Sequence, residues 1–316
     1  MIIPIEKLEL PLWQKFDVEL YLIRLDQTHS YISGNKWFKL QPVLQQAQNN
    51  VNQPLLSFGG AYSNHLHALA YAGFKYGFST HAIIRGEQPK VLNPTLQDMK
   101  NWGMQLHFVS RSEYANRYQP DYIEQLHQRF GDVQIIPEGG SSSESVSACG
   151  EIWNYLSKDQ PLSDYLGCAL GTGATVAGLI AKRPLETQVI VVPALKISAL
   201  EATQMLRQHW QASNLERKEE IEINKGFSVF DGELPYARIT PMMAALWQRL
   251  TTCYGVDLDP VYTLRVYHRL SGLLLEGYFS AGSKVALLHT GGLQGIRGFQ
   301  QQLQQRSAAY YGPLPI

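Results

Sequence analysis

The sequence contains little cysteine. Its three cysteines, Cys149, Cys168 and Cys253, are odd in number and far apart, and none belongs to a CxxC pair. Evenly paired cysteines are typical of disulfide-bonded secreted domains, and paired CxxC motifs are typical of zinc sites. The sequence therefore predicts a reduced compartment and no disulfide framework. We expect all three cysteines to be buried as small apolar side chains.

The chain also lacks an excess of charge of either sign. Lysine plus arginine and aspartate plus glutamate both number 27, so the formal net charge is zero. No basic cluster or stripe interrupts this balance, which excludes the electrostatic pattern of a nucleic-acid-binding protein or of one that binds an anionic membrane. The composition therefore favours a small molecule as the partner.

Long apolar runs are missing as well. The uncharged, mostly apolar run 165–181 contains four glycines and two threonines, which fits a strand, a loop and a helix start better than a membrane span. Residues 1–7 do not combine a basic segment with an apolar one, as a signal peptide would. The sequence thus predicts a cytoplasmic protein without a membrane segment.

The hydrophobic pattern alternates between strand-like and helix-like segments over the 316 residues. Strands are predicted at 54–60, 81–84, 106–109, 133–136, 165–170, 189–192 and 285–288. Helices are predicted from residue 36 and over 63–76, from 93, over 122–130 and 145–157, from 176, and over 240–254 and 263–277. This alternation predicts an α/β protein of two lobes, each a mostly parallel sheet covered by helices, with ligands at the carboxyl ends of the strands.

Two groups of residues indicate a phosphate ligand. Lys36 and Lys39 lie one helical turn apart after a Gly-Asn turn. Residues 171–175, Gly-Thr-Gly-Ala-Thr, join a strand to a helix and have the features of a phosphate loop. The loop lacks the Lys-Ser/Thr of a Walker motif, and Val176 stands where a dinucleotide-binding loop needs glycine. A single phosphate monoester is therefore favoured over a nucleotide, and a lysine together with a phosphate site fits pyridoxal phosphate.

Five ordered motifs resemble those of the 1-aminocyclopropane-1-carboxylate deaminase and D-cysteine desulfhydrase family, whose members are pyridoxal phosphate enzymes of the tryptophan-synthase-β fold type, also called fold type II. The match extends over nearly the whole chain. The motifs are residues 34–40, 58–65, 171–175, 259–263 and 289–292.

The resemblance implies roles for individual residues. It makes Lys36 the Schiff-base lysine and Tyr262 a neighbour of the cofactor ring, with Tyr236 as a second active-site tyrosine only if extra residues are allowed before it. The cofactor would be bound by Lys36, Lys39, Asn64, Gly171, Thr172, Gly173, Ala174, Thr175 and Thr290. The substrate carboxylate would be bound by Ser63, Asn64 and His65, and the catalytic residues would be Lys36, Ser63, Tyr262 and Tyr236.

Simpler interpretations stay open for several of these residues. The two lysines could be solvated helix charges, Ser63 could be only a helix N-cap, and each tyrosine could be a packing residue. Glu138 could be a site acid or a solvated turn charge. The spacing of His65 and His67 places them on different faces of a helix, so no metal site is predicted.

Position 263 bears on the choice of reaction. The deaminase branch of the family carries a glutamate there, whereas this chain has Thr263, which cannot supply a negative charge. We therefore expect an α,β-elimination on a small amino acid, with D-cysteine giving pyruvate, ammonia and hydrogen sulfide. The alternatives are a 1-aminocyclopropane-1-carboxylate deaminase or a related amino-acid deaminase, a racemase-like enzyme, and a phosphate-ligand-binding module without turnover.

The order of the motifs also predicts how the chain divides. Residues 41–149 would form a small αβ domain, and residues 1–40 with 150–316 a large domain that binds pyridoxal phosphate. The cofactor would lie in the cleft between them. The family resemblance implies a homodimer.

Overall fold

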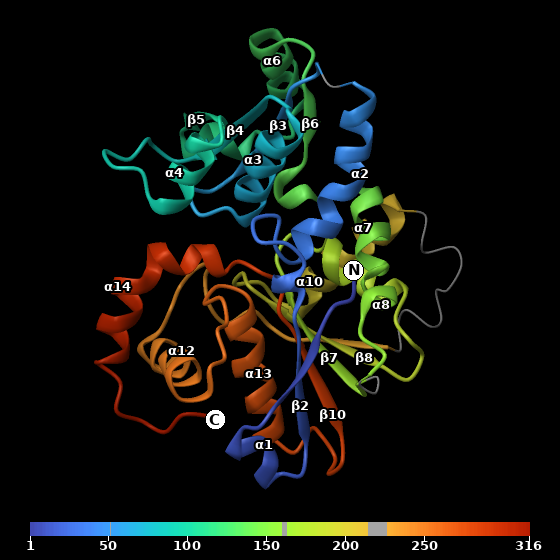
Figure 1. Ribbon diagram of the computed structural model, residues 1–316, viewed down its shortest axis with the longest axis vertical. Helices are drawn as coiled ribbons and strands as arrows, with labels where there is room; N and C mark the ends of the chain where they lie inside the picture. Colours follow the sequence, from blue (N-terminus) through green and yellow to red (C-terminus); the bar gives the residue numbers. More distant parts are fainter. Residues whose placement is uncertain (51, 160–162, 214–225) are drawn as a thin grey trace.

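A computed structural model describes residues 1–50, 52–159, 163–213 and 226–316. It contains two sheets in two lobes, each covered by helices (Figure 1). The prediction of an α/β protein with two mostly parallel sheets is confirmed. The domain boundaries at residues 41 and 149 stay a prediction.

The larger sheet has six strands in the order β1-β2-β10-β7-β8-β9. Its neighbouring strands are parallel except for β1 and β2, which pair antiparallel. The strands are β1 (Ile5–Leu8), β2 (Glu19–Ile23), β7 (Tyr165–Leu170), β8 (Gln188–Pro193), β9 (Phe227–Val229) and β10 (Lys284–Leu288). The sheet therefore combines the beginning of the chain with its second half.

The smaller sheet has four parallel strands in the order β5-β4-β3-β6. They are β3 (Leu55–Gly59), β4 (Thr80–Arg85), β5 (Gln105–Val109) and β6 (Gln134–Ile136). Figure 1 shows this sheet in the upper lobe, with α3, α4 and α6 around it. The seven strands predicted from the sequence all occur, whereas β1, β2 and β9 were not predicted.

Helices follow most strands, as parallel strand pairs require. The α-helices are α1 (Pro11–Lys15), α2 (Asn35–Asn49), α3 (Asn64–Tyr76), α4 (Pro94–Asn101), α5 (Arg111–Ala115), α6 (Pro120–Phe130), α7 (Ser143–Gly150), α8 (Ile152–Tyr155), α9 (Ala174–Ala181), α10 (Ala199–Ala212), α12 (Pro241–Tyr254), α13 (Thr263–Leu275) and α14 (Ile296–Ser307). Short 3₁₀ helices are η1 (Leu25–Gln27), η2 (Glu138–Gly140) and η3 (Leu293–Gly295).

The helix expected over 145–157 differs from the prediction. It begins earlier, after the N-cap Ser142, and is divided into α7 and α8 at Glu151. The N–H of Glu151 donates to the carbonyl of Ala148, three residues back, so the turn tightens there. Close packing explains the position, because a Cβ at Gly150 would lie 3.0 Å from the carbonyl oxygen of Gly178 in α9.

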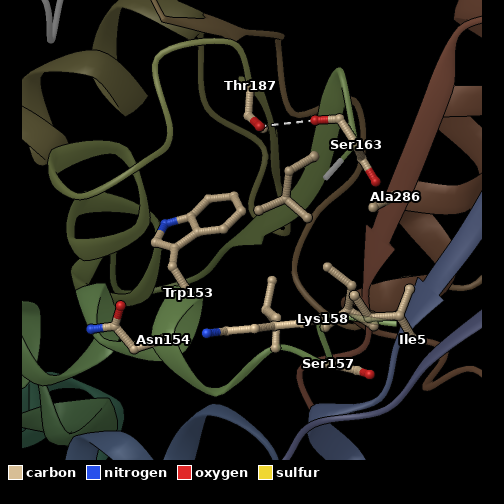
Figure 2. A pocket seen from close by; sticks show the side chains of 11 residues that line it. Ile5, Trp153, Asn154, Ser157, Lys158, Ser163, Thr187 and Ala286 are labelled. Carbon is tan, nitrogen blue, oxygen red and sulfur yellow. Dashed lines mark hydrogen bonds between the residues drawn. The ribbon is translucent and has the colours of Figure 1, made fainter. Parts of the chain in front are cut away.

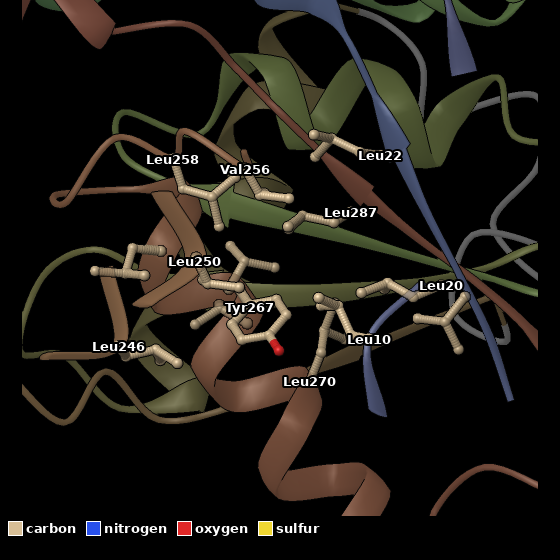
Figure 3. Close-up of a cluster of buried hydrophobic side chains, with 14 of the residues drawn as sticks. Leu10, Leu20, Leu22, Leu246, Leu250, Val256, Leu258, Tyr267, Leu270 and Leu287 are labelled. Atoms are coloured by element: carbon tan, nitrogen blue, oxygen red, sulfur yellow. The ribbon is translucent and has the colours of Figure 1, made fainter. Parts of the chain in front are cut away.

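Both faces of the larger sheet are buried. One face packs on α12 and α13 in a cluster that includes Leu20, Leu287 and Tyr267 (Figure 3). The opposite face holds a second cluster with Val189, Ala286 and other apolar residues. Burial on both faces is what keeps parallel strands uniformly apolar. The buried sheet therefore fixes the positions at which the loops at its carboxyl edge begin.

The structure bears on two features of the sequence, the few cysteines and the lack of long apolar runs. Cys149 and Cys168 are buried, but Cys253 is exposed near the end of α12, so the prediction that it is buried was wrong. Periodicity explains the error, because Met243, Leu246 and Leu250 occupy the buried side of that helix. Within the described ranges, no helix is both long and apolar enough to cross a bilayer.

Candidate active site

The helix that carries Lys36 begins against the loop that follows β10. The N–H of Asn35 donates to the carbonyl of Thr290 over 3.2 Å. Gly34 has a φ of +69°, and a Cβ there would lie 1.9 Å from the same oxygen. Only glycine fits this contact and this conformation. The Gly-Asn turn thus fixes the start of α2 beside the carboxyl end of the larger sheet.

Lys36 has a weakly basic amine. Its Nζ donates to Oδ1 of Asn35 over 3.0 Å. Desolvation lowers the pKa of Lys36 to about 7, and the positive charge of Lys39 adds to this effect. A substantial fraction of the amine is therefore neutral at pH 7, so it can act as a nucleophile or as a base.

Lys39 is surrounded by neutral oxygens. Its side chain is 2% exposed, and Nζ donates to the carbonyl of Gly139 and the hydroxyls of Ser141 and Thr172, at 3.0, 3.0 and 3.1 Å. Desolvation lowers its pKa to about 8. In the described part of the chain, no carboxylate pairs with this ammonium. A buried cation without a counter-ion fits a site for an anionic group.

The predicted phosphate loop lies next to this ammonium. Gly173 has a φ of +97°, and α9 begins directly after it, so the first N–H groups of the helix have no partner within it. The hydroxyl of Thr172 lies 2.5 Å from that of Ser141. Thr175 accepts a hydrogen bond from Nδ2 of Asn35 over 2.9 Å. The loop is thus tied to α2, which carries Lys36, and to Ser141, which lies between η2 and α7.

The Ser63-Asn64-His65 turn opens helix α3 at the end of β3. Ser63 is the N-cap, and its Oγ accepts from the N–H of Leu66 over 3.2 Å. Asn64 accepts from Nε2 of Gln294 over 2.6 Å, which links it to the loop after β10. The N-cap role is therefore observed, and it leaves the Ser63 hydroxyl proton free for another bond.

His65 is buried at the start of α3, against Ser57 of β3. Its Nε2 lies 2.8 Å from the hydroxyl of Ser57, while Nδ1 has no hydrogen-bond partner among the described atoms. Burial, and then the charges of Lys36 and Lys39, hold the pKa of His65 well below its usual value. His65 is therefore neutral. Because the Ser57 hydroxyl donates to the carbonyl of Ile136, Nε2 of His65 carries the ring hydrogen and Nδ1 can only accept one.

Tyr262 and Tyr236 meet at their hydroxyls, 3.2 Å apart. The ring of Tyr262 also lies 3.2 Å from where a Cβ on Gly171 would be, so it packs on the first residue of the phosphate loop. Burial raises the pKa of both phenols, that of Tyr262 well above its usual value. The structure therefore brings the two tyrosines together, and both stay protonated at neutral pH.

Thr263 is occupied by an internal contact. Its hydroxyl donates to Oδ2 of Asp259 over 2.7 Å, and its N–H donates to the same oxygen over 2.8 Å. Oδ1 of Asp259 accepts from the N–H groups of Val261 and Tyr262. The buried carboxylate therefore caps the start of α13, and the side chain at position 263 is part of this cap.

Three features at the site were not predicted from the sequence. Ser141 contacts both Lys39 and Thr172, and Nε2 of His209 lies 2.6 Å from the carbonyl of Thr172. Glu138 forms an ion pair with Arg117 over 3.0 Å instead of standing alone in a turn. The sequence signal for Ser141 was its place after a strand and a glycine pair, but His209 gave no signal because it lies inside a regular helix.

A separate cavity of about 370 Å³ lies in the larger lobe (Figure 2). Its walls include Ile5, Trp153, Lys158 and Leu166. Ser163 and Thr187, which precede β7 and β8, place it near the amino ends of those strands. None of the predicted site residues lines it, so it is distinct from the lysine site.

The chain is similar in sequence to curated proteins over about nine-tenths of its length, although no family model matches it. It is 27% identical to a putative 1-aminocyclopropane-1-carboxylate deaminase of Pyrococcus abyssi, over 92% of this chain and 89% of that one. It is 26% identical to a bifunctional D-cysteine desulfhydrase/1-aminocyclopropane-1-carboxylate deaminase of Arabidopsis thaliana, over 88% and 73%. The family resemblance seen in the motifs is confirmed.

Solved structures agree on the fold. A crystal structure of a 1-aminocyclopropane-1-carboxylate deaminase homologue has a TM-score of 0.81 at 23% identity, covering 97% of this chain and 94% of that one. Threonine deaminase isoform 2 from Solanum lycopersicum has a TM-score of 0.64 at 14% identity, covering 98% and 84%. The prediction of the fold type II architecture is confirmed, as is the prediction of an enzyme, since these relatives are named as enzymes.

Proposed function

We propose that this chain is a pyridoxal phosphate-dependent enzyme that catalyses an α,β-elimination on a small amino acid, with D-cysteine as its substrate. The observation that carries the proposal is the pair of lysines one turn apart. Lys36 is a desolvated amine with a pKa of about 7, and Lys39 is a buried cation facing neutral oxygens. The amine of Lys36 can attach an aldehyde covalently, and the ammonium of Lys39 can bind a phosphate.

The residues of the site fit pyridoxal phosphate. Lys36 would attach the cofactor through its amine, and Asn64 and Thr290 would contact the ring oxygen and the ring nitrogen. The phosphate would be held by Lys39 and the loop of Gly171, Thr172, Gly173, Ala174 and Thr175. When bound, this cofactor takes up the electron pair that is released when an amino acid loses its α-hydrogen.

The chain's own residues would supply binding and proton transfer. The hydroxyl of Ser63 and the first N–H groups of α3 would bind the substrate carboxylate, and neutral His65 would line the site beside them. Lys36, neutral once the substrate amine has replaced it, would accept the α-proton. Tyr262, kept protonated by its raised pKa, would donate a proton to the departing sulfur. D-cysteine and water would give pyruvate, ammonia and hydrogen sulfide, with no oxidant or reductant required.

A 1-aminocyclopropane-1-carboxylate deaminase is the second candidate, and the names of the relatives support it equally. The contact between Thr263 and Asp259 favours elimination. The side chain at position 263 is neutral and already bonded, so it provides no acid for protonating a cofactor ring nitrogen. A weaker electron sink suffices when the leaving group is a thiol.

The test is an assay of the purified protein with D-cysteine, L-cysteine and 1-aminocyclopropane-1-carboxylate, measuring sulfide, 2-oxo acid and ammonia separately. We expect sulfide and pyruvate in equal amounts from D-cysteine. Ammonia from the cyclopropane substrate without sulfide from D-cysteine would favour the deaminase. If neither substrate gives a product although borohydride fixes the colour of the protein, the cofactor assignment holds and both substrates are excluded.

A further inference from the structure

His209 lies against the phosphate loop from outside the site. It belongs to α10, and its Nε2 is 2.6 Å from the carbonyl oxygen of Thr172. Because a carbonyl oxygen only accepts, Nε2 must carry the hydrogen and donate it. The short distance indicates a well-formed hydrogen bond between a side chain and the loop backbone.

The same imidazole fills the space beside Gly173. A Cβ at this glycine would lie 2.7 Å from Cδ2 and 2.8 Å from Nε2 of His209. Gly173 also has a φ of +97°, a conformation that disfavours a side chain. The loop and the imidazole ring are therefore in direct contact. Both the positive φ of Gly173 and the adjacent ring exclude a side chain at this position.

The hydrogen bond fixes the orientation of one peptide group. In a trans peptide, the C=O and the following N–H point in opposite directions. With the carbonyl of Thr172 directed to His209, the N–H of Gly173 points away from His209. On the other side, the Thr172 hydroxyl is held by Lys39 and Ser141. Thr172 is thus held from two sides, through its backbone by His209 and through its side chain by the lysine cluster.

We propose that His209 is a positioning residue for the cofactor phosphate: by holding the Thr172 carbonyl, it keeps the N–H groups at the start of α9 directed at the anion. This inference rests on the proposed function. The role of His209 is distinct from that of Lys39, because His209 acts on the loop and not on the ligand. The proposal predicts that a change at His209 weakens the binding of ligands that carry a phosphate more than of those that do not.

A merely structural role of α10 can be separated from this one. Trp210, the next residue of the helix, donates from Nε1 to the carbonyl of Ala177 in α9 over 3.0 Å. Trp210→Phe therefore removes a hydrogen bond between α10 and α9 without touching the loop. His209→Phe removes the donor but keeps a ring, and His209→Gln keeps an N–H donor on a side chain of similar reach.

The experiment titrates pyridoxal phosphate, and separately pyridoxal, into the full-length protein after removal of bound cofactor, and follows the absorbance of the lysine-bound form. We expect His209→Phe to raise the Kd for pyridoxal phosphate about tenfold, as for the loss of one hydrogen bond. The Kd for pyridoxal should change less than about twofold, because it has no phosphate to bind the loop. His209→Gln should restore most of the affinity, and Trp210→Phe should lower the Tm without this selectivity.

The outcomes separate the two proposals. If the unmodified protein captures neither compound, the proposed function fails. If it captures both, but His209→Phe weakens them equally, or Trp210→Phe matches its selectivity, or His209→Gln gives no recovery, His209 is not a positioning residue for the phosphate.

Discussion

The hydroxyl of Tyr262 donates a hydrogen bond to the hydroxyl of Tyr236 over 3.2 Å. Tyr262 precedes α13, whereas Tyr236 lies in the irregular segment between β9 and α12. The sequence motif identified the first tyrosine but reached the second only by allowing extra residues. Their contact supports both assignments, and elimination would require the Tyr262 hydroxyl to turn its proton from Tyr236 to the departing sulfur.

The tyrosine pair leads to a prediction about proton transfer. Tyr262→Phe should lower kcat for D-cysteine about 100-fold, within the usual range for loss of a general acid. Tyr236→Phe should have a smaller effect, because it removes only the partner of the donor. Steady-state sulfide release at saturating substrate measures both, and the cofactor content of each variant serves as the control. Equal losses in the two variants would contradict this division of roles.

Lys36 and Lys39 should differ when each is replaced. Lys36→Ala removes the amine that attaches the cofactor, so borohydride should fix no pyridoxal phosphate and elimination should stop. Lys39→Ala should leave the attachment possible but weaken it, because the buried cation that faces the phosphate is lost. Mass spectrometry after borohydride treatment distinguishes the two variants. Stable labelling of Lys36→Ala at Lys39 would show that the assignment of the two lysines is reversed.

The lowered pKa of Lys36 predicts how covalent capture depends on pH. Only the neutral amine attacks an aldehyde, and below pH 7 most of this lysine is protonated. The rate of capture of pyridoxal by cofactor-free protein should therefore rise about tenfold per pH unit below 7 and level off above it. Stopped-flow absorbance measures the rate, and pyridoxal avoids titration of a phosphate. A rate that keeps rising to pH 10 would indicate an ordinary lysine.

Gly34 should be indispensable for stability. A Cβ at this position would meet the Thr290 carbonyl at 1.9 Å, in a residue with positive φ. Gly34→Ala should lower the free energy of unfolding by about 3 kcal/mol or more. Gly77→Ala is the matched control, because Gly77 also has positive φ but nothing within 4 Å of its Cβ position. Its cost should be about 1 kcal/mol. Denaturant titration compares them, and equal costs would argue against the contact.

Introducing an acid at position 263 should not convert the enzyme into a cyclopropane-opening deaminase. Thr263→Glu would place a second carboxylate beside Asp259, with the loss of the hydroxyl bond to it. We expect a loss of about 2–4 kcal/mol in the free energy of unfolding, whereas Thr263→Ser should cost about 1 kcal/mol or less. Thermal unfolding and an assay with 1-aminocyclopropane-1-carboxylate check this. New deaminase activity in a stable Thr263→Glu protein would contradict it.

Local patterns in the sequence predicted the central part of the fold. The cap residues Ser63, Asn93 and Thr240 start helices as expected, because a side chain oxygen next to an apolar periodic run has few other uses. The strands β3 to β8 and β10 were all predicted as apolar runs between turns. In contrast, β1 lies at the sheet edge, and β1 and β2 contain the charged residues Glu6, Lys7 and Glu19, so they were not identified as apolar runs.

Local motifs drew attention to the candidate site at residues 171–175, which follow β7, and at Lys36, which follows a Gly-Asn turn. It was not predictable where contacts join distant segments. His209 lies in α10 and Arg117 in the turn between α5 and α6, neither of which was identified as a site element, and only the folded chain brings them to Thr172 and Glu138. Residue roles toward the cofactor, the cytoplasmic location and the homodimer stay predictions.

The hydrogen bond from Asn35 to Thr290 has a consequence for biosynthesis. The two residues lie near opposite ends of the chain, and β10 must insert between β2 and β7 before they can meet. During translation, the amino-terminal segment therefore cannot complete its contacts until β10 has been made. The lysine site cannot form while β10 is still inside the ribosome. Cofactor capture should accordingly follow release of the finished polypeptide, and truncations before β10 should yield colourless protein.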